Sequence, residues 1–143
     1  MKIKLLDARA KLPTKGSEYS AGWDLYADSE FRIEIPPQAT HKINTGIAVE
    51  IPEGYFGAIF ARSGLATKNG LRPANCVGVI DSDYRGPIMV AMYNDTDYWQ
   101  DVEPGSRIAQ LVVIPYLPVE LEVVDELEET DRGENGFGST GMK

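Results

Sequence analysis

The sequence predicts an all-β domain with one short helix, followed by a flexible C-terminal arm. Short apolar segments outnumber helical patterns along the chain. Pro and Gly turns separate these segments at about the 8–12-residue spacing that is typical of β-sandwiches and barrels. After residue 124 the composition changes to acidic residues and glycine, which bury too little apolar surface to order a segment. We therefore expect a β domain over residues 1–124 and an arm over residues 125–143.

The first half of the chain contains four expected strand regions. Residues 3–6 form an apolar opening, and residues 31–35 alternate between apolar and charged side chains. Residues 43–51 place apolar side chains among polar ones before the turn at 52–54. Residues 55–60 are aromatic and apolar, which favours a strand that packs against a core.

The middle of the chain contains the one expected helix and an expected hairpin. The helix covers residues 63–68, because the Asn69-Gly70 pair behind it is a typical helix end. Two apolar segments, 77–80 and 88–93, flank the polar residues 81–86. This order predicts a hairpin with a polar tip.

The last expected strands are residues 108–115 and 119–124. The first is a long apolar run, which predicts a strand buried on both faces. Gln110 interrupts it, and an unpaired buried amide would cost about 1–3 kcal/mol. Gln110 therefore either belongs to a hydrogen-bond network of the core or faces a site. Residues 119–124 alternate between apolar residues and glutamate, which predicts a further strand.

Charge and composition exclude several classes of protein. The net charge is -8 and the pI about 4.6, which argues against a protein that binds nucleic acid with a basic face. A small anion is compatible with this charge, since a few arginines and N–H groups can hold phosphate. Cys76 and His41 are each single, so neither a disulfide framework nor a zinc site of thiolates and imidazoles is expected. Because no signal-peptide pattern or apolar run of about 20 residues is present, we expect a soluble cytoplasmic protein without membrane association.

Two groups of residues are candidates for phosphate chemistry. Arg62, Ser63 and Gly64 lie where a strand meets the expected helix, so a guanidinium and free N–H groups could hold an anion. Asp81 and Asp83 share one side of an extended segment, and one of them could act as a general base toward water. Taken singly, each group favours a structural role, in which Ser63 caps the helix and the two acids form a turn.

Two further features have both a functional and a structural interpretation. Arg132, Phe137, Ser139 and Thr140 are interleaved with glycines in the arm. A cation, a ring and hydroxyls are the parts of a lid that closes on a nucleotide, although a frayed terminus is the usual state of such a segment. Asp24 is expected on a loop, where an isolated acid is usually solvated.

Five segments, taken in order, resemble the motifs of the trimeric dUTPase family, and the likeness covers nearly the whole chain. They are AGWDLYA at 21–27, RSGLA at 62–66, GVIDSDYRG at 78–86, PGSRIAQL at 104–111 and RGENGFGSTG at 132–141. The resemblance implies a distorted jelly-roll β-barrel and a homotrimer in which three subunits share each active site. It also implies hydrolysis of dUTP to dUMP and diphosphate with Mg²⁺, which limits uracil in DNA and supplies dUMP for dTMP synthesis.

The resemblance also implies roles for individual residues. Asp81 resembles the acid that contacts the 3′-hydroxyl and positions the attacking water, and Tyr84 resembles the residue under the deoxyribose. Asp24 resembles the acid that holds the magnesium shell through water, while the ion is held mainly by the triphosphate. The expected phosphate binders are Arg62, Ser63, Gly64 and Gln110. The expected uracil readers are Asn75, Val79, Ile80 and Met89. The expected residues of the closing arm are Arg132, Phe137, Gly138, Ser139 and Thr140, with Phe137 stacked on uracil.

Two departures from the family pattern and two alternatives accompany this expectation. Trp23 stands where the family often has Tyr, and Asn135 stands where Gly is usual, which bears on the closing of the arm. A dCTP deaminase of the same fold would need a glutamate three residues before Asn94, where this chain has Ala91. A dUTPase-like protein that binds nucleotide only as a regulatory signal is the other alternative.

Overall fold

The computed structural model describes residues 1–134 and 136, which form eleven strands and one helix. The elements are β1 (Lys2–Leu5), β2 (Trp23–Tyr26), β3 (Ile33–Ile35), β4 (Thr40–Asn44), β5 (Ile47–Glu50), β6 (Tyr55–Phe60), α1 (Ser63–Asn69), β7 (Leu71–Pro73), β8 (Gly78–Ile80), β9 (Met89–Asn94), β10 (Gln100–Val102) and β11 (Arg107–Pro115). The all-β class with one short helix is thus confirmed. Among these residues, no helix is long and apolar enough to cross a bilayer.

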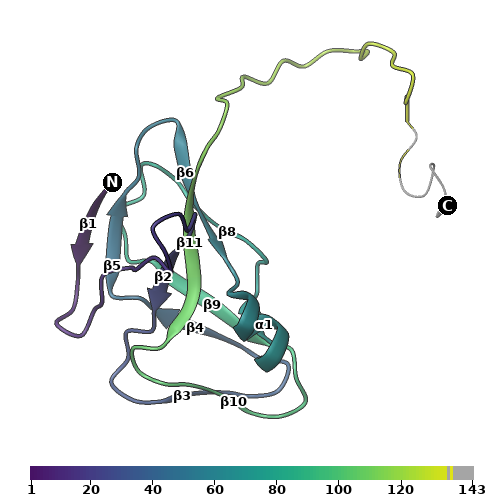
Figure 1. The fold of residues 1–143 in the computed structure, drawn as a ribbon. Coiled ribbons are helices and arrows are strands. Elements are labelled where there is room, and N and C mark those ends of the chain that lie inside the picture. Colours follow the sequence, from purple (N-terminus) through teal and green to yellow (C-terminus); the bar gives the residue numbers. More distant parts are fainter. Residues whose placement is uncertain (135, 137–143) are drawn as a thin grey trace.

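The strands form four separate antiparallel sheets. The largest has the order β2-β11-β6-β8, and a second has the order β4-β9-β7. Two further pairs, β1-β5 and β10-β3, complete the set. Within residues 1–134 none of these sheets closes on itself, so a closed barrel is not formed by the hydrogen-bonded ladders (Figure 1).

One hydrophobic core lies between the four sheets. Leu25, Ile35, Ile43, Met92 and Leu111 come from five different strands, and each is 1% exposed or less. Burying such a side chain contributes about 1.5–3 kcal/mol, so this shared cluster holds the sheets together. Strand β11 lies in the middle of the largest sheet. Its first half is buried as the sequence predicts, whereas residues 112–114 are only half-buried.

Two expectations for the β segments are wrong in detail. The apolar region 43–51 is two strands, because Gly46 breaks it with φ of +67°. The expected hairpin around residues 81–86 does not form as a strand pair. Strand β8 pairs with β6, whereas β9 pairs with β4 and β7, so the turn between them connects two sheets.

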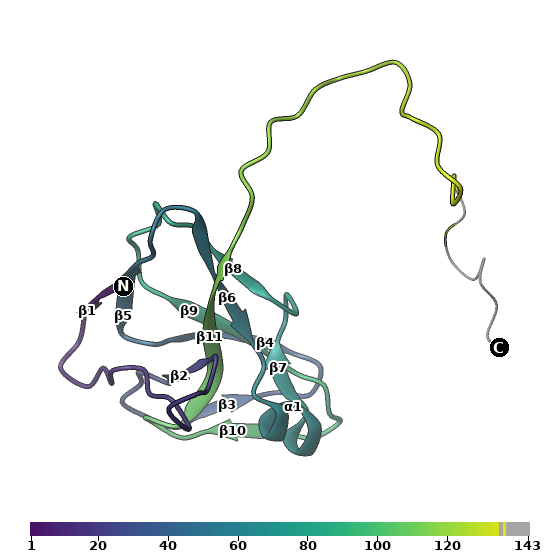
Figure 2. The same cartoon turned by 45° about the horizontal axis from the view of Figure 1, so that its top comes forward.

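The C-terminal segment after β11 leaves the body of the molecule. Residues 117–134 extend away from the sheets in both views (Figures 1 and 2). The strand expected over residues 119–124 is wrong for this single chain, because the segment pairs with no strand. Leu121 and Val123 are 95% and 98% exposed, so this segment adds nothing to the core. The division of the chain at residue 124 stays a prediction.

Candidate functional site

The residues of the first, second and fourth motifs meet in one depression of the surface. We call it the polar cleft; it has a volume of about 280 Å³. Its lining residues are Gly16, Ser20, Gly22, Asp24, Arg62, Ser63, Gly64, Arg107 and Gln110. Strands β2, β6 and β11 are neighbours in one sheet, which explains why segments far apart in sequence contribute to it. The cleft thus unites the expected residues Asp24, Arg62, Ser63, Gly64 and Gln110.

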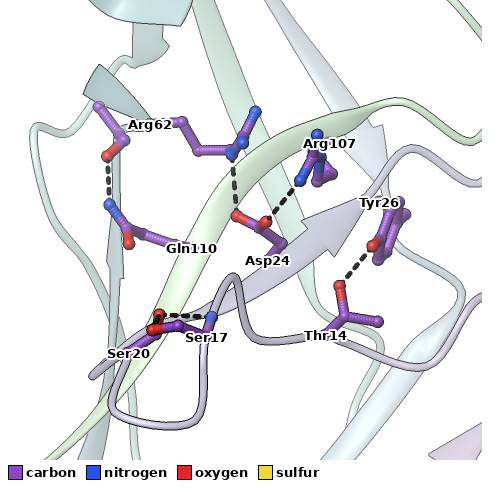
Figure 3. A network of polar contacts seen from close by, with 9 residues as sticks. Thr14, Ser17, Ser20, Asp24, Tyr26, Arg62, Arg107 and Gln110 are labelled. Atoms are coloured by element: carbon purple, nitrogen blue, oxygen red, sulfur yellow. Dashed lines mark hydrogen bonds and ion pairs between the residues drawn. The ribbon is translucent and has the colours of Figure 1, made fainter. Parts of the chain in front are cut away.

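An ion-pair network occupies the polar cleft. Asp24 lies on β2 rather than on a loop, and its side chain is only 13% exposed. Arg62 Nε donates to Asp24 Oδ1 at 2.8 Å, and Arg107 Nη1 donates to Asp24 Oδ2 at 3.3 Å. The two guanidinium groups approach the carboxylate from two sides (Figure 3). The expectation of a solvated Asp24 is therefore wrong, because two arginines hold it.

The start of α1 presents Ser63 to the cleft. Arg62 is the N-cap residue, and its side chain makes no capping hydrogen bond. The structural interpretation of Ser63 as a cap is therefore wrong, and its exposed side chain lines the cleft. At the other end, Gly70 adopts φ of +63° as the C-cap, as the Asn-Gly pair predicts.

Gln110 faces the cleft from the middle of β11. Its Nε2 donates to the Ala61 carbonyl oxygen at 2.9 Å, which fixes the amide beside Arg62 (Figure 3). Gly22 makes room for it, since a Cβ on Gly22 would lie 2.5 Å from Gln110 Oε1. Of the two interpretations of Gln110, the structure favours the one in which it faces a site.

The residues of the third motif gather at a second depression, which we call the turn pocket. It has a volume of about 200 Å³ and is lined by Val79, Ile80, Asp81, Tyr84, Pro87 and Met89. Five of these six residues are expected site residues. Asp81 also borders a wider groove of about 560 Å³ that reaches Tyr116 at the base of the C-terminal segment.

Asp81 and Tyr84 are held differently in the turn pocket. Residues 81–84 form a turn in which Tyr84 N–H donates to the Asp81 carbonyl at 3.2 Å. The extended segment expected for Asp81 and Asp83 is therefore wrong, although both still line one groove. Tyr84 is fixed, because its hydroxyl donates to the Pro87 carbonyl at 3.1 Å. The exposed Asp81 carboxylate has no hydrogen-bond or ion-pair partner among residues 1–134, so it is available to a ligand.

The polar cleft and the turn pocket are separate in one chain. They share no lining residue. Asp24 on β2 and Ile80 on β8 lie at opposite edges of the four-stranded sheet, which is about 14 Å across three strand spacings. Asn75 lies near Gly78, at 3.5 Å from its Cβ position, and is not part of either lining. Arg132 lies on the extended segment, while the expected residues 137–140 lie outside the described part of the chain.

Sequence reasoning missed Arg107 as a site residue, along with Gly16, Ser20 and Gly22 on the cleft wall. Arg107 lies inside the fourth motif, and a second arginine near a phosphate candidate was the available signal. Ser17 and Ser20 bond to each other at 2.9 Å and hold the loop that forms this wall (Figure 3).

Comparisons with known proteins agree with the five motifs. The family model for dUTPase matches residues 8–141. The deoxyuridine 5'-triphosphate nucleotidohydrolase of Syntrophotalea carbinolica is 45% identical over 142 residues, which cover 99% of this chain and 97% of that protein. The protein of the same name from Desulfitobacterium hafniense is 49% identical over 137 residues, which cover 95% of this chain and 91% of that one.

Solved structures show the same likeness. The dUTPase of Staphylococcus bacteriophage 80alpha with dUPNHPP has a TM-score of 0.90 at 33% identity, covering 98% of this chain and 97% of that one. A mutant dUTPase from phage phi11 of S. aureus has a TM-score of 0.80 at 27% identity, covering 90% and 98%, and coordinates a structural Mg(II) ion.

Proposed function

The chain belongs to the dUTPase family, and on that basis we propose that it hydrolyses dUTP to dUMP and diphosphate. One structural observation supports the proposal independently of family membership. The expected phosphate residues form a cationic cleft, and the expected nucleoside residues form a separate pocket with a free carboxylate. A triphosphate needs cations and N–H donors, whereas a nucleoside needs a shaped, mostly apolar pocket.

The reaction that we propose is a direct attack of water on the α-phosphorus. Asp81 accepts a proton from the water, whose oxygen bonds to the α-phosphorus. The bond between that phosphorus and the oxygen that bridges to the β-phosphorus breaks, and diphosphate leaves with the electron pair. Asp81 is exposed and has no hydrogen-bond or ion-pair partner among residues 1–134 and 136, so its carboxylate is free to orient the water. Arg62, Ser63 and Gln110 hold the phosphates and stabilise the charge that develops on them.

Magnesium is part of this proposal as a partner of the substrate. Asp24 is the one carboxylate in the lining of the polar cleft, and residues 1–134 and 136 contain no cluster of three or more metal-ligating acids, histidines or cysteines. Mg²⁺ commonly binds one or two carboxylates together with substrate phosphates and water, so these residues fit an ion that arrives with the triphosphate. Asp24 would accept hydrogen bonds from the water molecules around the Mg²⁺ ion. The ion would neutralise part of the phosphate charge.

We also propose a homotrimer with shared sites, which the separation of the two depressions supports. The cleft of one chain and the turn pocket of a neighbour can face a single dUTP molecule, whereas one chain holds them at opposite sheet edges. Exposed apolar side chains on the C-terminal segment and half-buried ones on β11 support association. The jelly-roll arrangement and closure of residues 132–140 over the γ-phosphate and uracil belong to the same proposal.

The test is diphosphate release from each common deoxynucleoside triphosphate, with and without Mg²⁺. We expect dUTP to be the preferred substrate, and chelation of the metal to remove most activity. A 5-methyl group on the base should clash with the narrow turn pocket, so dTTP should be a poor substrate. Comparable turnover of dTTP and dUTP would contradict the assignment of the pocket, and ammonia release from dCTP would favour a deaminase. A particle mass near three times 15.7 kDa is expected in solution.

A further inference from the structure

Arg107 reaches the polar cleft because of an irregularity in the sheet. Across β2, Gln110 pairs with Asp24 and Ala109 with Leu25, but Arg107 pairs with Tyr26. Ile108 is therefore one extra residue, a β-bulge. In a regular strand, Arg107 would face away from Gln110, because side chains alternate. The bulge places it on the face of Asp24 and Gln110, and bulges often re-aim a side chain near a functional site.

The bulge gives the Asp24 carboxylate two cationic partners. The other lining residues of the polar cleft are glycine, serine and glutamine, which are neutral. Arg62 with Asp24 alone would make a neutral pair. Arg107 adds a second positive charge, so the three side chains together carry one net positive charge on a chain of net charge -8.

Arg62 keeps its outer donors for a ligand in this arrangement. Its Nε is bonded to Asp24, while its two terminal amino groups have no partner among residues 1–134 and 136. The side chain is 29% exposed. Asp24 thus fixes the direction of the guanidinium and leaves its phosphate-binding edge open.

We propose that Arg107 is a positioning residue that shares the Asp24 carboxylate, so that Asp24 orients Arg62 without neutralising the polar cleft. This inference rests on the proposed function, because the ligand is the triphosphate of dUTP. Without the Arg107 charge, Asp24 would repel the phosphates that Arg62 attracts. Arg107 therefore acts on substrate affinity, through Asp24, more than on the chemical step at Asp81.

The first test compares Arg107→Gln, Arg107→Ala and Arg107→Lys by calorimetric binding of α,β-imido-dUTP and by steady-state kinetics. Loss of the charge should weaken binding about 10- to 100-fold, whereas Lys should stay within about threefold because it keeps the charge. KM should rise by more than kcat falls. Arg32→Gln is the matched control, since Arg32 pairs with Glu34 and Asp101 outside the cleft. Thermal melts check that each variant is folded.

A double-mutant cycle separates this role from a direct phosphate contact. In an Asp24→Asn background there is no carboxylate to share, so Arg107→Gln should change affinity by less than about threefold. An undiminished loss in that background would mean that Arg107 contacts phosphate itself, and it would overturn the proposal. Equal affinity of wild type and Arg107→Gln would overturn it as well. A wild-type protein that binds no α,β-imido-dUTP would instead refute the proposed function.

Discussion

The polar cleft and the turn pocket are built in opposite ways. In the cleft, side chains from β2, β11 and the start of α1 hold one another through ion pairs, and Asp24 is largely buried. In the turn pocket, Tyr84 is fixed by a backbone carbonyl, and the Asp81 carboxylate has no hydrogen-bond or ion-pair partner within residues 1–134. The cleft is thus arranged in advance for charge, whereas the turn pocket offers shape and one unpaired carboxylate.

This difference indicates which kinetic constant each depression controls. The groups of the cleft bind the phosphates before the reaction as well as during it, so we expect their loss to act mainly on affinity. A free carboxylate that takes a proton acts on the chemical step. Variants of the two depressions should therefore separate into KM and kcat effects.

The largest effect is expected for Asp81→Asn. The amide keeps the shape but cannot take the proton of water, so kcat should fall about 10²–10⁴-fold. Binding of α,β-imido-dUTP should change far less, because the phosphates are held by the polar cleft. Rapid-quench measurement of turnover together with calorimetry checks both parts.

Asp83→Asn is the matched control for this change. Asp83 lies two residues away on the same turn and borders the same groove, and its replacement should reduce kcat much less. Near-normal turnover of Asp81→Asn would show that the proposed mechanism is wrong even if dUTP is hydrolysed.

Removal of residues 132–143 should have the second largest effect. The described residues after β11 add nothing to the core, so the truncated protein should fold and melt like the full chain. Activity should fall about a hundredfold if these residues close the site. Circular dichroism measures the folding of the truncated protein, and diphosphate release measures its activity. An unchanged rate would mean that residues 132–143 have no role in catalysis.

A smaller effect is expected for Gly22→Ala, which tests the rigidity of the polar cleft. The added Cβ would lie 2.5 Å from Gln110 Oε1 and 3.3 Å from Gln110 Cβ, so the amide must move. We expect KM to rise about tenfold, in line with the loss of one hydrogen bond, with little change in kcat. In Gly16→Ala the Cβ would meet only Ser20 Oγ at 3.6 Å, and its KM should change much less. Equal KM values for the two variants would mean that the cleft accommodates the added methyl group without loss of affinity, and that it is not rigid.

The smallest effect is expected for Glu50→Gln, outside both depressions. A hydrogen bond from Lys2, together with its charge, lowers the pKa of Glu50 below the ordinary value of 4.5. A lowered folded-state pKa adds stability above the ordinary value, and this is lost as the pH falls below it. The side chains of Lys2 and Glu50 are 82% and 44% exposed, so the melting temperature at pH 7 should hardly change. The remaining difference should vanish as the pH falls through the lowered pKa of Glu50. A large difference in melting temperature at pH 7 would contradict the expectation that this exposed ion pair contributes little stability.

The sequence predicted local structure better than pairing. The strand over residues 55–60 and the helix near residues 63–68 match β6 and α1, because both depend on neighbouring residues. The pairing of β8 with β6 depends on contacts between distant segments, which the polar tip at 81–86 could not indicate. The expected strand over 119–124 has the right alternation, but a strand needs a partner, and this chain alone offers none within the described residues.

The candidate site shows the same contrast between local sequence signals and contacts of distant segments. Asp24, Arg62, Ser63, Gly64 and Gln110 were predicted from motifs, and the structure brings them together. The position of Arg107 depends on a single extra residue in the ladder between β2 and β11, and no residue type marks a bulge there. The burial of Asp24 likewise depends on arginines that are 38 and 83 positions away in the chain.

The separation of the polar cleft from the turn pocket has a genetic consequence. If neighbouring chains complete each site, a chain with a damaged cleft still supplies a sound turn pocket, and a chain with a damaged pocket still supplies a sound cleft. A ring of three that contains both kinds of chain has one junction where the two sound halves meet. Two alleles that are each inactive alone, such as Arg62→Gln and Asp81→Asn, would then complement each other in one cell.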